Sequence, residues 1–289
     1  MNYDGDIIRP PSEADSIIIQ VTVGCSHNRC TFCGAYKDKE FRVRSDAEVA
    51  ENIAFAMKHC GLQKRVFFAD GDALILSQKR LVKLFKEIKF YLPQVNRIAL
   101  YGNSKAIRTK SEAELRELRE LGLHRIYMGL ESGDDAVLAQ VKKGETAASM
   151  IHAAHLVRNA GVFLSVTVLI GLAGIRKSLQ HAAETARVLS EMRPNQIAAL
   201  CLIPLANTEI GNQFETGKFQ LLNPDQMLLE LQKLIENISC APVQFMANHA
   251  SNYLPLSGRL PRDREAMLGN IAQALLGNRA LVPEKFRAL

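Results

Sequence analysis

IIIQVTVGCSHNRCTFC, residues 17–33, is the stretch that decides the fold. Its first seven residues are rich in Ile and Val and predict a buried strand. Cys25, Cys30 and Cys33 follow in the loop at the C-terminal end of that strand. A disulfide joins two cysteines, so one of these three would stay unpaired. A structural zinc site needs four ligands, commonly with a second C-x2-C pair, which this chain lacks. Iron–sulfur clusters are held by cysteine thiolates. The loop therefore predicts an iron–sulfur cluster with one iron open to a small molecule, and the alternative is a chance group of buried or redox-sensing cysteines.

Beyond this loop, predicted strands and helices alternate. Capping boxes at 45–48 and 111–114, each followed by apolar residues at helical spacing, predict two of the helices. Further buried strands are predicted at 65–69, 96–101, 125–130, 163–170 and 196–203. Strands that alternate with helices in this way are parallel and are joined by right-handed crossovers. Six such units predict an α/β fold, a partial (β/α)6 TIM-type barrel with a C-terminal helical and loop cap.

The expected domain organisation is one structural unit with three parts. Residues 1–16 form an irregular lead-in, residues 17–208 form the barrel, and residues 209–289 form an extension that caps it. The extension is expected to contain a helix from Pro224, a strand at 241–246 and an amphipathic helix at 261–277.

The composition is that of a mildly basic chain, with 289 residues and a formal net charge of +6. This charge is compatible with an anionic substrate or with RNA but requires neither. The six cysteines are too unevenly placed for a disulfide framework, so a reducing, cytoplasmic location is expected. No signal-peptide pattern and no run long enough to cross a membrane is present, so no membrane partner is expected. Two groups of residues are expected to be structural: small core cysteines at Cys60, Cys201 and Cys240, and a solvated basic loop with Lys37, Lys39, Arg42 and Arg44.

The cysteine loop resembles the cluster motif of the radical S-adenosylmethionine (SAM) superfamily, including an aromatic residue, Phe32, directly before the last cysteine. The usual form is C-x3-C-x2-C, so this chain has one extra residue between Cys25 and Cys30. The resemblance implies a 4Fe-4S cluster on the three cysteines and SAM bound to the open iron. It also implies reductive cleavage of SAM to a 5′-deoxyadenosyl radical, and a flavodoxin- or ferredoxin-like electron donor as partner.

Loops at the C-terminal ends of other strands extend the resemblance. Asp70-Gly71-Asp72 is a loose match to the Gly-Gly-Glu-like segment that binds the SAM ammonium group, although acidic residues around a glycine are also ordinary turn chemistry. The segment Gly129-Leu130-Glu131-Ser132-Gly133 is similar to one found in a branch of this superfamily. That branch includes anaerobic coproporphyrinogen oxidase, the methylthiotransferases and Elongator-type enzymes, and the similarity implies that Glu131 contacts SAM. The same resemblance implies that Lys143 pairs with the SAM carboxylate, for which a solvated lysine at a helix end is the alternative.

Two later strand ends are also similar to the family. The segment 202–208, which contains Pro204, resembles a segment whose backbone lies near adenine. After the strand at 163–170, the chain has Ala173-Gly174-Ile175 where the family often carries Pro-Gly-Glu, so the acid is missing. Together, the resemblance implies that Phe32, Asp70, Gly71, Asp72, Glu131, Lys143 and Pro204 contact the cofactors.

The tail contains one segment with a dense set of hydrogen-bonding side chains. Its candidates for substrate contact are Asn248, His249, Ser251, Asn252 and Tyr253, of which His249 and Tyr253 are the candidates for catalysis. A well-capped surface connection is the alternative. The sequence favours a radical SAM enzyme with an unidentified substrate, and the competing hypothesis is a non-catalytic iron–sulfur redox or sensor protein on the same barrel.

Overall fold

In the computed structural model, residues 1–239 and 242–288 are described, and they divide into two compact units. The first unit comprises residues 1–28, 35–128 and 155–164, and the second comprises residues 29–34, 129–154 and 165–289. The strands of one sheet follow the order β1-β4-β5-β6-β7-β8-β9-β10. A short second sheet pairs β2 with β3.

The first unit contains the early strand–helix repeats. Its strands are β1 (Ile17–Gln20), β2 (Thr22–Val23), β3 (Arg42–Val43), β4 (Arg65–Ala69), β5 (Arg97–Tyr101) and the first part of β6 (Leu123–Glu131). Its helices are α1 (Asp46–His59), α2 (Gln78–Tyr91), α3 (Ser104–Arg108), α4 (Glu112–Glu120) and the end of α6 (Ala147–Asn159). β1 pairs in parallel with β4, β4 with β5 and β5 with β6. The C-terminal ends of these strands therefore lie at one edge.

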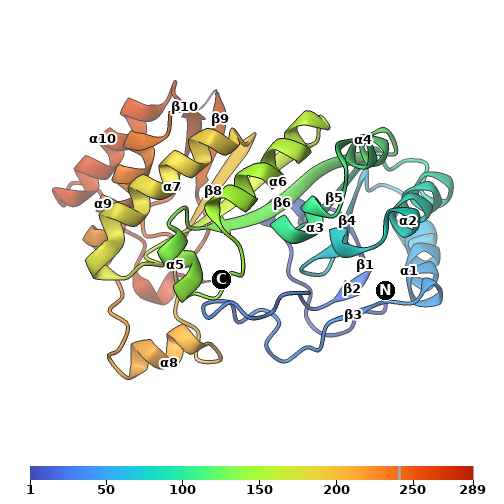
Figure 1. Cartoon of the computed structure of the whole chain (residues 1–289), viewed down its shortest axis with the longest axis horizontal. Coiled ribbons are helices and arrows are strands. Elements are labelled where there is room, and N and C mark those ends of the chain that lie inside the picture. The colour runs from blue at the N-terminus through green and yellow to red at the C-terminus, as the bar shows by residue number, and fades with distance from the viewer. Residues whose placement is uncertain (240–241, 289) are drawn as a thin grey trace. The chain divides into compact units, whose positions relative to one another are not determined.

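The second unit contains the later repeats and the tail. It holds α5 (Asp135–Gln140), most of β7 (Phe163–Ile170), α7 (Ser178–Met192), β8 (Gln196–Cys201), α8 (Glu209–Glu215), α9 (Pro224–Asn237), β9 (Val243–Ala247), β10 (Leu256–Leu260) and α10 (Arg264–Leu275). β7, β8 and β9 are parallel neighbours, and β10 pairs antiparallel with β9. α9 packs between α7 and α10, as Figure 1 shows.

The fold class is confirmed, because the six predicted barrel strands correspond to β1, β4, β5, β6, β7 and β8 and the sheet is mostly parallel. β9 overlaps the described part of the strand expected at 241–246. Ser45 and Ser111 form capping boxes with Glu48 and Glu114, also as predicted. The antiparallel strand β10 was not predicted. Its sequence, LSGRL, alternates buried and exposed positions over only five residues and contains a glycine, which leaves a weak strand signal.

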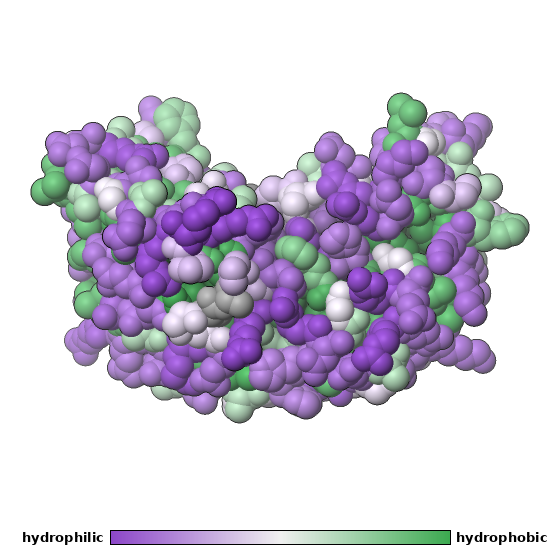
Figure 2. Space-filling model, turned by 90° about the horizontal axis from the view of Figure 1, so that it is seen from above, coloured by the Kyte–Doolittle hydropathy of each residue, from purple (hydrophilic) through white to green (hydrophobic). Residues whose placement is uncertain are grey.

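The molecular surface fits the charged composition. On the face shown in Figure 2, hydrophilic residues predominate and hydrophobic residues form small separate groups. Among the described residues, no helix has both the length and the apolar character needed to cross a bilayer.

Candidate functional site

The three cysteines of the loop divide between the two units. Cys25 belongs to the first unit, and Cys30 and Cys33 belong to the second. All three are thiols of intermediate burial. Among the described residues, no three or more His, Cys, Asp or Glu side chains gather as ligands of one metal ion. A 4Fe-4S cluster takes its thiolates on different irons, so its cysteines do not converge on a single atom.

Backbone and apolar contacts fix the later half of the cysteine loop in the second unit. The Thr31 amide donates to the Val141 carbonyl (3.0 Å), and the Ile210 amide donates to the Thr31 carbonyl (2.9 Å). The Phe32 ring packs against a buried cluster that includes Val141 and Ile210. The aromatic residue of the motif is therefore an apolar anchor between Cys30 and Cys33.

The loop after β4 lies directly against Cys25. The Gly71 amide donates to the Gly24 carbonyl at 3.1 Å. A Cβ atom added at Gly71 would lie 2.6 Å from the Tyr36 ring and 3.2 Å from the Cys25 Cβ. Only a glycine allows the backbone to come this close. The chain thus places the Asp70-Gly71-Asp72 segment beside the first cysteine of the motif.

Asp70 is fully buried and joins several segments of the first unit. Its carboxylate accepts hydrogen bonds from the Gly24 amide (3.2 Å), the Gln20 side chain (3.3 Å) and the Tyr36 hydroxyl (3.1 Å), and the Lys39 ammonium lies 3.8 Å away. Burial raises the pKa of Asp70, and these donors and Lys39 oppose that rise.

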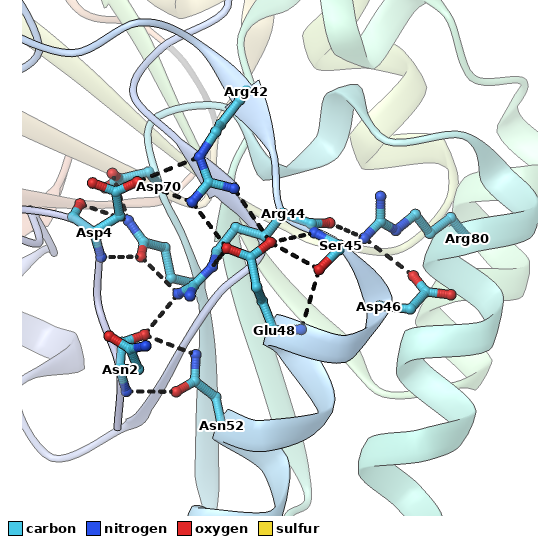
Figure 3. A network of polar contacts seen from close by, with 11 residues as sticks. Asn2, Asp4, Arg42, Arg44, Ser45, Asp46, Glu48, Asn52, Asp70 and Arg80 are labelled. Carbon is cyan, nitrogen blue, oxygen red and sulfur yellow. Dashed lines mark hydrogen bonds and ion pairs between the residues drawn. The ribbon is translucent and has the colours of Figure 1, made fainter.

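Gln20 links this network to Asp4 and Arg44, and Figure 3 shows these two residues near Asp70. Its side chain accepts from the Arg44 guanidinium at 3.0 Å and from the Asp4 amide at 2.9 Å. The expectation of a solvated basic loop is therefore wrong for Arg44, which is buried, and for Lys39, whose side chain is 8% exposed. Both cations instead compensate buried polar groups.

Asp72 forms a second buried network at the same edge. Its carboxylate accepts from the Ser26 hydroxyl and from the amide and the side chain of Asn103, the latter at 2.7 Å. Asn103 also caps α3. Burial raises the pKa of Asp72 to about 6, although these donors and Lys110 lower it. The network connects the residue after Cys25 with the loops after β4 and β5.

In the second unit, the structure brings Glu131 and Lys143 together. The Lys143 ammonium lies 3.1 Å from the Glu131 carboxylate, and the two side chains are 13% and 12% exposed. Glu131 ends β6 with a positive φ of 66°, a conformation that side chains rarely adopt and that clusters at functional sites. A Cβ at Gly129 would lie 2.0 Å from the Glu131 carboxylate. A larger residue at position 129 would therefore displace this carboxylate from its place beside Lys143.

Pro204 lies in the segment after β8 and is half-buried. Thr208 ends this segment and caps α8, since its hydroxyl oxygen accepts from the Gly211 amide at 3.0 Å. The segment thereby leads into the helix whose Ile210 amide holds Thr31.

The candidate substrate residues of the tail lie in different environments. Asn248 is exposed and His249 is half-buried, whereas Ser251, Asn252 and Tyr253 are buried. The Asn252 side chain donates to the Ala199 carbonyl of β8 at 2.9 Å, and the Tyr253 hydroxyl donates to Glu284 at 2.6 Å. Burial lowers the pKa of His249, so its imidazole is neutral at pH 7.

Sequence reasoning missed several polar residues of these networks, among them Tyr36, Asn103 and Arg287. Tyr36 and Asn103 follow the cysteine loop and β5, and neither belongs to a motif. Arg287 lies near the chain end, where its guanidinium stacks 3.9 Å from the Tyr253 ring. Of these residues, only Asn103 could have been predicted from the sequence to cap a helix, because an asparagine before a helix-forming run is a common N-cap.

The remaining cysteines were predicted as core residues. Cys201 is buried as predicted, and burial raises its pKa to about 12. The prediction is wrong for Cys60, which is partly exposed and lines a surface groove of about 700 Å³ in the first unit. Cys240 lies outside the described residues.

Part of the chain is similar in sequence to a known protein. An uncharacterized methyltransferase of Pyrococcus horikoshii is 26% identical over 156 residues, which are 53% of this chain and 32% of that protein. The chain thus spans about a third of that relative.

Two solved structures show a similar fold. The radical SAM methyltransferase TsrM from Kitasatospora setae, with cobalamin and a 4Fe-4S cluster bound, has a TM-score of 0.55 and 16% identity over 67% of this chain and 38% of that one. Coproporphyrinogen III oxidase from Escherichia coli, also a radical SAM enzyme, has a TM-score of 0.55 and 18% identity over 76% of this chain and 51% of that one.

A model of the radical SAM superfamily matches residues 19–188, a range that contains the cysteine loop and the Glu131–Lys143 pair. The cofactors of this family are a 4Fe-4S cluster and SAM, as the cysteine loop predicts. Because the match covers more than half of its length, the chain belongs to the radical SAM superfamily.

Proposed function

We propose that this protein is a radical SAM enzyme in which Cys25, Cys30 and Cys33 hold the 4Fe-4S cluster. The observation that carries the proposal is the close approach of the Gly71 backbone to Cys25 at the C-terminal edge of β1 and β4. That edge is where barrel enzymes place their chemistry. When bound, the reduced cluster supplies the electron that cleaves SAM to methionine and a 5′-deoxyadenosyl radical.

The chain's own residues would bind and orient SAM. The carboxylates of Asp70 and Asp72 are occupied by protein donors, which leaves the backbone of Asp70-Gly71-Asp72 to accept from the SAM ammonium group. Glu131 and Lys143 form an ion pair that offers an acceptor for a ribose hydroxyl and a cation for a carboxylate. The backbone near Pro204 is proposed to contact adenine.

The substrate would be selected by the tail. We assign this role to Asn248, His249, Ser251, Asn252 and Tyr253, with His249 and Tyr253 as the candidates for catalysis. His249 and Asn248 are the accessible members of the group. His249→Ala is expected to abolish substrate turnover and to leave SAM cleavage intact. The barrel at residues 17–208 and the cap at 209–289 would work as one unit, with a flavodoxin- or ferredoxin-like donor in the cytoplasm.

One experiment tests the enzyme proposal. The protein is reconstituted with iron and sulfide without oxygen, mixed with SAM and dithionite, and assayed for 5′-deoxyadenosine. Cys25→Ala, Cys30→Ala and Cys33→Ala should each lose bound iron and product, whereas Cys60→Ala should lose neither. Bound iron without 5′-deoxyadenosine in the wild type would favour the non-catalytic redox or sensor protein instead.

A further inference from the structure

The loop after β7 is held by a hydrogen bond from outside the sheet. It begins at Gly171, which has a φ of +87° and follows directly on the strand. The Gly171 amide donates to the Glu230 carboxylate of α9 at 2.8 Å. A buried amide needs such a partner, because an unsatisfied donor costs about 1–3 kcal/mol. The first turn of this loop is therefore fixed by a side chain 59 residues further along the chain.

Glu230 is fully buried and receives two further hydrogen bonds. The Ser178 hydroxyl donates to one carboxylate oxygen at 2.5 Å, and His181 Nδ1 lies 2.9 Å from the other. A carboxylate only accepts, so this imidazole nitrogen carries the proton. An uncompensated buried carboxylate is costly, and three donors compensate this one. The carboxylate is thus held in place from α7 as well as from the loop.

Met227 supports the loop one turn earlier on α9. A Cβ added at Gly171 would lie 2.6 Å from the Met227 methyl carbon and 2.9 Å from its sulfur. The positive φ favours glycine at the start of the loop, and any other residue there would displace the end of the Met227 side chain. α9 therefore contacts the loop through a side chain on each of two successive turns.

We propose that Glu230 is a positioning residue that fixes the Gly171–Gly174 loop for SAM binding. The loop lies at the C-terminal end of a barrel strand, where ligands bind in such folds. Within the loop, Ala173-Gly174-Ile175 offers no acid of its own, and the buried acid comes instead from α9. This inference rests on the proposed function, because it assigns the loop a role in holding SAM.

The test compares Glu230→Gln with Glu236→Gln, which changes an exposed glutamate on the same helix. Hydrogen exchange is measured on the amides of Gly171–Gly174, and SAM binding is measured by calorimetry on the anaerobically reconstituted protein. In Glu230→Gln we expect the Gly171 amide to exchange about tenfold faster and the Kd for SAM to rise about tenfold. Iron content and the exchange of β8 and β9 should not change. In dithionite-driven cleavage, KM for SAM should rise while kcat stays constant.

Ser178→Ala is the second variant, in case Glu230→Gln does not fold. It removes one donor and leaves the Gly171 bond in place, so exchange and Kd should move in the same direction by a smaller factor. Folded variants with wild-type exchange and wild-type SAM affinity would overturn the inference. A wild type that binds no SAM would overturn the proposed function itself, and the exchange experiment would still decide whether Glu230 anchors the loop.

Discussion

At the scale of single residues, the Asp72 carboxylate is fully buried. Its pKa is about 6 in the folded chain and near its ordinary value of 3.8 in the unfolded chain. The folded chain therefore binds more protons between these values, and the free energy of unfolding falls as the pH rises from about 4 to about 6. Since one pKa unit corresponds to about 1.4 kcal/mol, the loss amounts to about 3 kcal/mol.

Asp72→Asn should remove this pH dependence, because asparagine does not titrate. Urea unfolding of the wild type and the variant at several pH values between 4 and 7 measures the difference. Asp38→Asn changes an exposed aspartate of the same unit and should follow the wild-type curve. Parallel curves for wild type and Asp72→Asn would show that the buried carboxylate does not titrate in this range.

The family resemblance assigns Glu131 to SAM, and this assignment stays a prediction. Glu131→Gln should keep the cluster and weaken SAM binding about ten- to a hundredfold, because a hydrogen bond to a charged group contributes about 1.5–3 kcal/mol. Glu209→Gln is the matched control, since Glu209 pairs with the neighbouring Lys142 at 2.6 Å but is exposed. Calorimetry with SAM on both variants distinguishes them, and equal affinities would assign Glu131 a structural role.

At the scale of elements, helix starts and buried strands could be predicted because their signals are local. Ser45 and Ser111 are followed three residues later by glutamate, and that spacing alone specifies the capping box. Arg44, next to one of these caps, was misjudged because its partners Asn2 and Gln20 are distant in sequence. Charge and spacing cannot show that an arginine is buried against such partners.

The candidate site shows the same division. The resemblance indicated Glu131 and Lys143 separately as residues that contact SAM. It did not indicate that the two form an ion pair with each other, because α5 separates them in the sequence. Glu230 carries no motif and lies on a helix whose spacing indicates only a core-facing side. Its role depends on the path of the β7 loop, which appears only in three dimensions.

The loop after β4 provides a prediction at this scale. Gly71→Ala places a methyl group against Tyr36 and Cys25, so the loop must move and bound iron after reconstitution should decrease. Gly61→Ala is the control, because a Cβ there meets no other atom of the described residues within 4 Å. The cluster content of both variants is measured as bound iron and as charge-transfer absorption. Full iron content in Gly71→Ala would mean that the cysteine loop tolerates movement of its neighbour.

At the scale of the whole molecule, Arg287 connects the last described residues of the chain to the C-terminal end of β8. The Arg287 guanidinium donates to the Ser251 carbonyl (2.7 Å) and to the Leu202 carbonyl after β8 (3.4 Å). It also donates to the Tyr253 hydroxyl (2.6 Å) and pairs with Glu284. Its side chain is 1% exposed, so the carbonyls of the buried residues Ser251 and Leu202 have this guanidinium as their partner in place of water. One residue thus joins the strand end, the candidate substrate segment and the chain terminus.

Arg287→Met keeps much of the apolar volume and removes every one of these donors. We expect the free energy of unfolding to fall by about 2–3 kcal/mol, because buried acceptors are left unsatisfied. Lys285→Met, two residues away and exposed, should leave stability unchanged. Urea unfolding measures the loss, and limited proteolysis locates it. Cleavage of Arg287→Met near residues 248–253 would show that Arg287 holds the candidate substrate segment in place. If both variants unfold alike and resist the protease, the segment is held by β9 and β10 alone.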